Sequence, residues 1–296
     1  MSALRRQKNR AIRFNSAFYR AINRGGRIDV MNADWDNLLI LDACRADMFD
    51  GEPPFGERVS TRLSPGSESW EFMQSSFDGR TLHDTVYVTA NPHTSELPSD
   101  TFHAVINLLD HHWDDQAHTV LPETVVEETK RVFAEYPQKR IVTHFMQPHF
   151  PFIGEFGRTL NHKGIESVAE SNGTEKPHPW FALMYGNTDE RERVIEAYEE
   201  NLEVVLPHVA ELLDALPGRS VVTADHGNLL GEWTFPIPVR AYGHPPGLHK
   251  RELIEVPWIE IESPERRSIT AESPVSHEEL DEDLLVERLA DLGYHE

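Results

Sequence analysis

Two short apolar runs, far apart in the sequence, each end abruptly in acidic or imidazole side chains. The first is Asn37-Leu-Leu-Ile-Leu before Asp42, and the second is Ser220-Val-Val-Thr-Ala before Asp225 and His226. An unbroken apolar run is typical of a parallel strand that is buried on both faces. Because parallel strands end at the same edge of a sheet, we expect the two motifs to meet around one cation.

Two carboxylates and one imidazole are suitable metal ligands. Asp42 alone indicates little, because an Asp after a strand often only caps a helix. The adjacent Asp225 and His226 are more specific, and Gly227 lets the backbone turn tightly beneath them. Such ligands suit zinc, manganese, magnesium or calcium, and the sequence does not choose among these metals or between one ion and two.

Further apolar runs alternate with helical patterns along the chain. Strands are expected near residues 37–42, 85–90, 103–108, 140–146, 219–224 and 255–260, and helices near 69–77, 122–136, 188–216 and 277–292. This alternation predicts an α/β fold with a mainly parallel sheet and helices on both faces. The segment 153–187 is predicted to be a long active-site loop.

Four motifs in this order make the chain similar to the alkaline phosphatase superfamily, and within it to the sulfatase-like branch. They are LLILDACRAD around Asp42, THFMQPHFPF around His149, TADHGNLLGE at 223–232, and GHPPGLHKRELIEVPW ending at Trp258. The resemblance covers residues 36–262. It implies that Asp42, Asp225 and His226 share a metal with a nucleophile at a helix N-terminus. It also implies that His149 contacts the bound anion.

The nucleophile is expected among the serines that precede the helix near 69–77. A hydroxyl at a helix N-terminus benefits from the helix dipole and from backbone donors that hold an anion. The family spacing to Gly79 ranks Ser69 first, Ser67 second and Ser64 third. Each serine would also serve as a simple helix cap. Metal coordination would lower the pKa of the attacking hydroxyl.

The sequence departs from the sulfatase pattern at the nucleophile. It lacks the Cys-x-Pro-x-Arg signal for conversion of cysteine to formylglycine, and its single cysteine, Cys44, is expected to be a small buried residue. This difference speaks against sulfate ester cleavage through a hydrated aldehyde. A serine nucleophile fits phosphoryl transfer better.

Other polar residues have less specific expectations. His149 is expected to protonate the leaving oxygen as well as to contact the anion. His244 and His249 flank a Pro-Pro-Gly turn, where either would contact the substrate, bind a second metal or lie in a solvated loop. Arg45 is expected to contact the substrate or orient the first aspartate, and His144 to be a core residue.

The charge of the chain is unusual. It carries 50 acidic and 28 basic residues, a formal net charge of -22, and only six of the bases are lysine. Such a surface repels nucleic acid, and its self-repulsion is screened in concentrated salt. We therefore expect a halophilic protein that is similar to a short haloarchaeal member of this family. We expect no nucleic-acid partner.

The N-terminus reverses this trend. Residues 1–28 contain eight bases and no acid, and the helical pattern gathers Phe14, Phe18 and Ile22 on one face. Such a helix either packs on the domain or contacts anionic lipid weakly, and we favour packing.

The length of 296 residues is enough for one sizeable core. We predict a basic arm at 1–30, a sulfatase-like catalytic domain at 31–262, and a connector with an acidic helix at 263–296. Neither a membrane span nor a signal peptide is apparent, so a cytoplasmic location is expected.

The predicted function is metal-dependent hydrolysis or transfer of phosphate or sulfate esters through a serine nucleophile. The substrate is expected to be a small molecule or an ester linked to a glycan or lipid. The alternative is a non-catalytic binding or assembly protein that keeps the fold and the metal site.

Overall fold

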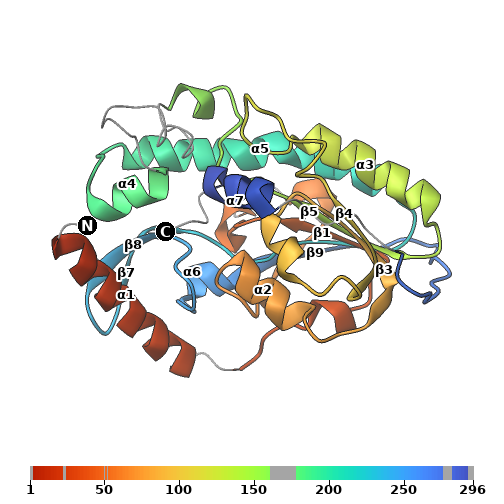
Figure 1. Cartoon of the computed structure of the whole chain (residues 1–296), viewed down its shortest axis with the longest axis horizontal. Coiled ribbons are helices and arrows are strands. Elements are labelled where there is room, and N and C mark those ends of the chain that lie inside the picture. Colours follow the sequence, from red (N-terminus) through yellow and green to blue (C-terminus); the bar gives the residue numbers. More distant parts are fainter. Residues whose placement is uncertain are drawn as a thin grey trace.

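The centre of the protein is a seven-stranded sheet with the strand order β2-β9-β6-β1-β5-β3-β4 (Figure 1). The computed structural model describes residues 3–22, 25–49, 51, 53–160, 178–275 and 282–292. The strands are β1 (Asn37–Leu41), β2 (Val59–Leu63), β3 (Leu82–Thr89), β4 (Phe102–Asn107), β5 (Arg140–Phe145), β6 (Ser220–Ala224) and β9 (Glu255–Ile261). Strands β6, β1, β5, β3 and β4 are parallel, whereas β9 is antiparallel to β2 and β6.

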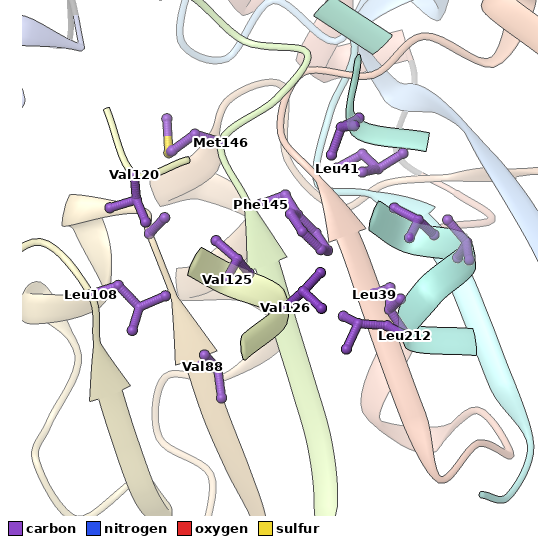
Figure 2. Close-up of a cluster of buried hydrophobic side chains, with 14 of the residues drawn as sticks. Leu39, Leu41, Val88, Leu108, Val120, Val125, Val126, Phe145, Met146 and Leu212 are labelled. Carbon is purple, nitrogen blue, oxygen red and sulfur yellow. The ribbon is translucent and has the colours of Figure 1, made fainter. Parts of the chain in front are cut away.

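Helices cover both faces of this sheet, so the predicted α/β fold is confirmed. Helices α3 (Pro122–Glu135) and α5 (Arg191–Ala215) lie along one face, and α2 (Ser69–Ser76) lies on the other (Figure 1). All five residues of β1 are buried, as expected for a central parallel strand. Leu39 and Leu41 pack with side chains of α3 and α5 (Figure 2), whereas Leu38 and Ile40 pack with α2.

Among the described residues, three strands and two short α-helices have no counterpart among the sequence predictions. Strand β2 forms the edge of the sheet, where its side chains are only partly buried and lack a continuous apolar pattern. Strands β7 (Leu229–Thr234) and β8 (Val239–Gly243) form a separate two-stranded sheet. Helix α4 (Pro179–Tyr185) lies within the predicted loop 153–187, of which residues 161–177 are outside the described part.

The ends of the chain carry two more helices. Helix α1 (Ala3–Ile22) lies beside β7 and β8 (Figure 1), and its Ala11 and Ile12 pack against Val239 and Ala241. Helix α7 (Glu282–Asp291) falls within the predicted helix 277–292, whose first five residues are outside the described part. A one-turn helix, α6 (Arg251–Ile254), precedes β9. Within the described ranges, no helix is both long and apolar enough to cross a membrane.

Candidate active site

The carboxyl ends of β1 and β6 bring the two sequence motifs together. These strands pair in parallel with Leu41 opposite Ala224, so the next residues, Asp42 and Asp225, emerge side by side. Ligand atoms of Asp42, Asp225 and His226 lie within 4.8 Å of one another, and all three residues are fully buried.

The turn after β1 has a strained backbone that is fixed from two sides. Ala43 has a φ of 58°, which is unfavourable for a residue with a Cβ atom. Its N–H donates to Asp225 Oδ1 at 3.1 Å, and its carbonyl accepts a hydrogen bond from the Tyr198 hydroxyl. The first motif is therefore held in place by the second motif and by α5.

The backbone around Gly227 sets the chemical form of His226. A Cβ atom at Gly227 would lie 2.2 Å from the carbonyl oxygen of Glu252, so no larger residue fits. The Gly227 carbonyl lies 2.8 Å from His226 Nδ1 and can only accept a hydrogen bond. Nδ1 therefore carries a proton, and Nε2 is the ring nitrogen that faces the site, 3.3 Å from Ser69 Oγ.

Ser69 is the serine that the structure brings to this cluster. It is the first residue of α2 and is fully buried. Its Oγ donates to Asp225 Oδ2 at 2.7 Å and lies 3.3 Å from both Asp42 Oδ2 and His226 Nε2. The hydroxyl thus lies among the three candidate metal ligands.

The chemistry of these four residues fits a divalent cation. Two buried carboxylates close together are costly unless positive charge compensates them. Burial opposes ionisation of Asp225, but the nearby His226 and His144 and a hydrogen bond from Ser69 lower its pKa below the ordinary value. Asp225 is thus suited to binding a cation as an anion, and Asp42, one imidazole nitrogen and one hydroxyl oxygen complete the donor set.

Two further histidines adjoin the cluster. His149 Nε2 lies 2.9 Å from His244 Nε2, and the rings of His244 and His226 are 4.8 Å apart. Burial, reinforced by His226, lowers the pKa of His149 to about 4. Burial also lowers the pKa of His244 well below its ordinary value, although the side chain keeps some contact with solvent. Both rings are therefore neutral near pH 7.

Helix α5 positions His149 through one buried amide. Asn201 Nδ2 donates to the carbonyls of Pro148, His149 and Pro151 at 3.0–3.2 Å, and Asn201 Oδ1 accepts from the N–H of Ile153 at 2.9 Å. The His149 N–H also donates to the Asp42 carbonyl at 3.2 Å. The loop after β5 is thereby tied to both α5 and the first motif.

Three residues near the site were not predicted to belong to it. Asn91 Nδ2 donates to Asp42 Oδ2 at 2.7 Å. His144, expected in the core, is fully buried, but its Nε2 lies 3.7 Å from Asp225 Oδ2. His178 packs 4.6 Å from the Phe150 ring, beside His149. The position of His144 next to the end of β5 could have indicated its role, whereas Asn91 and His178 carry no distinctive pattern.

The other predicted serines serve the loop around Ser69. Ser64 Oγ donates to the backbone carbonyl of Asp225 and accepts from the N–H of Gly66. Ser67 donates through both its N–H and its hydroxyl to Glu71 Oε2, at 2.9 and 2.8 Å. The two hydroxyls are thus bonded to the Asp225 backbone and to Glu71, rather than to the carboxylate of Asp42 or the ring of His226.

His249 and Arg45 take part in separate networks. His249 Nε2 lies 2.8 Å from Glu71 Oε1, and its Nδ1 accepts from Arg27 at 3.0 Å. Despite burial, hydrogen bonds from His249 and Ser67 lower the pKa of Glu71 to about 2. Thus His249 braces the loop of the predicted nucleophile.

Arg45 joins the turn after β1 to β7. Its guanidinium donates to Asp47, to Glu232 and to the carbonyl of Asn228, at 2.5–2.8 Å. Through these contacts Arg45 acts as a clamp that holds the turn after β1 against β7. Asp47, by pairing with Arg45, belongs to the same clamp.

The chain is similar to several solved structures. No family model matches the sequence, and no curated protein matches it significantly. The C-terminal periplasmic domain of phosphoethanolamine transferase EptC from Campylobacter jejuni is 14% identical, with a TM-score of 0.49 over 76% of this chain and 78% of that chain. The C-terminal periplasmic domain of EcEptC from Escherichia coli, in complex with Zn, is 12% identical, with a TM-score of 0.48 over 77% and 72%. A sulfatase-type structure from Bacteroides thetaiotaomicron is 14% identical, with a TM-score of 0.47 over 87% and 70%.

These likenesses to phosphoethanolamine transferase domains and to a sulfatase-type structure concern the overall fold. The three TM-scores lie below 0.5. No residue role is carried over from these proteins to the present chain.

Proposed function

We propose that the protein is a metal-dependent hydrolase or transferase acting on phosphate or sulfate esters, with Ser69 as the nucleophile. The observation that supports this proposal best is the position of the Ser69 hydroxyl among Asp42, Asp225 and His226. If the Ser69 hydroxyl only capped α2, the two buried carboxylates and the imidazole around it would have no explanation. In addition, the N-cap of α2 is filled by Glu68, whose side chain accepts from Trp70 and Glu71 N–H groups.

The four residues would hold one divalent cation, with zinc, manganese, magnesium and calcium all acceptable to the donors. When bound, the cation would lower the pKa of the Ser69 hydroxyl and neutralise charge on the transferred group. Ser69 Oγ then attacks the phosphorus or sulfur atom opposite the leaving oxygen. Its position at the start of α2 directs the helix dipole toward the developing negative charge.

The pair of His149 and His244 is proposed to assist at the substrate oxygens. His149 Nδ1 donates to the Phe150 carbonyl at 2.5 Å, so the neutral ring offers a bare Nε2 and His244 Nε2 carries the proton between them. A bound anion favours a positive charge on this pair of rings. One of them then donates a proton to the leaving oxygen.

Phosphate esters are the preferred substrates, since an unmodified serine is the attacking group. An ester linked to a lipid or a glycan is proposed alongside small-molecule esters. The role of His249 and Arg45 in this reaction is proposed to be positioning rather than substrate contact, because both are engaged with carboxylates of the fold.

The proposal is tested by turnover of p-nitrophenyl phosphate, bis-p-nitrophenyl phosphate and p-nitrophenyl sulfate, with and without a chelator. We expect metal-dependent turnover that Ser69→Ala lowers at least about a thousandfold. Elemental analysis should show that this variant still binds metal, because the two carboxylates and the imidazole remain.

Ser67→Ala is the matched control. It lies two residues away in the same loop and should cost only about 1 kcal/mol of stability through its lost hydrogen bond to Glu71, with little effect on turnover. Equal activity of the wild type and Ser69→Ala would exclude Ser69 as the nucleophile. Retained metal with no turnover of any ester would favour the non-catalytic alternative.

A further inference from the structure

Two sets of large apolar side chains are exposed on neighbouring elements and take no part in the candidate active site. On α1 they are Phe14, Phe18 and Ile22, with exposed fractions of 57, 41 and 57%. On the β7–β8 hairpin they are Trp233, Phe235 and Ile237, with 50, 51 and 41%. Single exposed apolar residues are ordinary, but two adjoining groups of three indicate an interaction surface.

A buried polar side chain links the two elements by hydrogen bonds. Asn15, which follows Phe14 on α1, donates from Nδ2 to Thr234 Oγ1 at 2.8 Å and to the Ile237 carbonyl at 2.7 Å. Its Oδ1 accepts from the Ile237 N–H at 3.0 Å. The hairpin turn is thereby fixed against the middle of α1, so the two apolar groups are carried by adjoining elements, with the ribbon of α1 beside β7 and β8 (Figure 1).

The charge of this face is opposite to that of the chain. Helix α1 and residues 233–243 contain no acidic residue, whereas the protein as a whole has a formal net charge of -22. They contain seven bases, which are Arg5, Arg6, Lys8, Arg10, Arg13, Arg20 and Arg240. Arg240 stacks over the exposed Trp233 ring at 5.3 Å, so base and aromatic ring are presented together. The complement of such a face is anionic.

The backbone of the hairpin turn is suited to an apolar environment. Pro236 and Pro238 have no N–H group, and both backbone groups of Ile237 are already bonded to Asn15. Inserting polar backbone groups into lipid is costly unless they are satisfied within the protein. The Phe-Pro-Ile-Pro turn therefore exposes apolar side chains at a reduced cost, because its prolines have no N–H group and the Ile237 backbone is bonded.

We propose that α1 and the β7–β8 turn together form a docking surface, here called the α1–hairpin surface, for a bilayer that contains anionic lipids. Phe235 and Ile237 enter the headgroup region, Trp233 lies at the interface, and the arginines of α1 contact lipid phosphates. A binding groove on another protein would not require a turn with a satisfied backbone. The proposal does not depend on the proposed enzymatic function.

The α1–hairpin surface adjoins the loop that supplies His244. A Cβ atom at Gly247 would lie 1.9 Å from Arg20 Nη2, so the end of α1 rests directly on this loop. Arg20 also lies 3.7 Å from Glu71 of α2. A docked molecule would thus hold one rim of the candidate active site near the lipid headgroups.

Flotation of the full chain with vesicles tests the proposal. Vesicles of phosphatidylcholine with one third phosphatidylglycerol are compared with pure phosphatidylcholine, at 0.1 M and at 1 M potassium chloride. At 0.1 M salt, we expect the protein to bind the anionic vesicles at least tenfold more strongly than the pure phosphatidylcholine vesicles. Because the Debye length falls from about 10 Å to about 3 Å, this preference should shrink at 1 M salt, and the apolar turn should carry the binding that remains.

Phe235→Ser combined with Ile237→Ser should lower binding at least tenfold at both salt concentrations. Val275→Ser with Val286→Ser is the matched control, since these valines are also exposed, at 39 and 54%, but lie outside the surface. Both double variants should keep the wild-type melting temperature and, if the protein is an esterase, its turnover of a soluble ester.

Three results would overturn the proposal. They are absence of flotation by the wild type, equal binding to both kinds of vesicle at 0.1 M salt, and equal loss of binding in the two double variants. A failure of flotation with normal ester turnover would leave the proposed function intact. Normal flotation without ester turnover would leave the docking proposal intact and would contradict the proposed function.

Discussion

Carboxylates lie near both ends of the paired strands β1 and β6, and the partners of these carboxylates differ between the two ends. At the amino end, Asp36 accepts hydrogen bonds from Arg266 Nε at 2.7 Å and from the Arg219 N–H at 2.8 Å, and the exposed Asp34 accepts from both guanidinium groups. At the carboxyl end, Asp42 and Asp225 contact a hydroxyl, an amide and imidazoles.

The contrast shows what distinguishes a candidate site from a structural ion network. Shifted pKa values occur at both ends of the sheet, so a shifted value alone does not identify the functional end. The difference lies in the partners, because a guanidinium compensates a carboxylate within the fold, whereas hydroxyl and imidazole groups can share it with a cation. The amino end therefore stabilises the sheet, and the carboxyl end is available for chemistry.

The largest expected effect comes from the same substitution made at each end. Asp225→Asn should lower both turnover and retained metal, with turnover falling about a thousandfold or more, because the amide is a weak metal ligand. Asp36→Asn should leave turnover within a few fold but cost about 2 kcal/mol of stability, since it weakens hydrogen bonds to a charged partner. Turnover, elemental analysis and urea unfolding of the two variants would check both parts.

A similar loss of metal from both variants would remove the distinction between the two ends. It would mean that Asp36→Asn disrupts the carboxyl edge of the sheet by a change that is transmitted along β1. Normal metal content in Asp225→Asn would instead exclude Asp225 as a ligand.

The second prediction separates the two ends by pH. Because His149 is neutral when folded and has its pKa lowered from 6.5 to about 4, the unfolded state binds protons first as the pH falls. Stability from this group is complete above pH 6.5 and is lost toward pH 4, by about 3 kcal/mol at 1.36 kcal/mol per pKa unit. Hydrogen bonds from Arg266 and Arg219 lower the pKa of Asp34, so its contribution is lost only in more acidic solution.

Chemical unfolding of chelator-treated protein between pH 7 and pH 4 measures this difference. The wild type should lose stability over that range more steeply than His149→Gln, whose side chain does not titrate. Identical slopes would show that His149 does not remain neutral in the folded protein. Asp34→Asn, as a control from the other end, should keep the wild-type slope.

The smallest effect is expected at the exposed edge of the amino-end network. Asp34 has a side chain that is 64% exposed, so Asp34→Asn should cost less than about 1 kcal/mol, and less still at molar salt. The wild type, in contrast, should melt at a higher temperature as salt screens the formal charge of -22. If Asp34→Asn cost more stability in high salt than in low salt, the expected ranking of the exposed Asp34 below the buried Asp36 would be contradicted.

Much of the sheet could be predicted because its central strands are buried on both faces and therefore unbroken in sequence. Strands β1, β5 and β6 lie close to the expected ranges. Strand β2 was missed because a half-exposed edge strand has no continuous apolar run, and β7 and β8 because their buried residues alternate with more exposed ones. The cytoplasmic location and the salt-adapted surface stay predictions.

The site was predictable where neighbouring residues carry the chemistry, as in Asp225 and His226. Ser69 ranked above Ser67 only through family spacing, since both serines look alike in sequence. The contribution of Asn91 depends on the order of strands, which places β3 beyond β5. Likewise, the engagement of His249 and Arg45 with nearby carboxylates depends on side-chain partners from distant elements that no local pattern specifies.

The pairing of β1 with β6 also determines when the site can exist during synthesis of the chain. The paired residues Asn37 and Ser220 are 183 positions apart, so the first aspartate leaves the ribosome long before its companion. Closing so long a loop precedes any gain from the contacts it allows, which makes this pairing a late event in folding. A nascent chain that ends before β6 therefore lacks Asp225 and His226, and a cation that needs these residues could bind only after the two distant strands have joined.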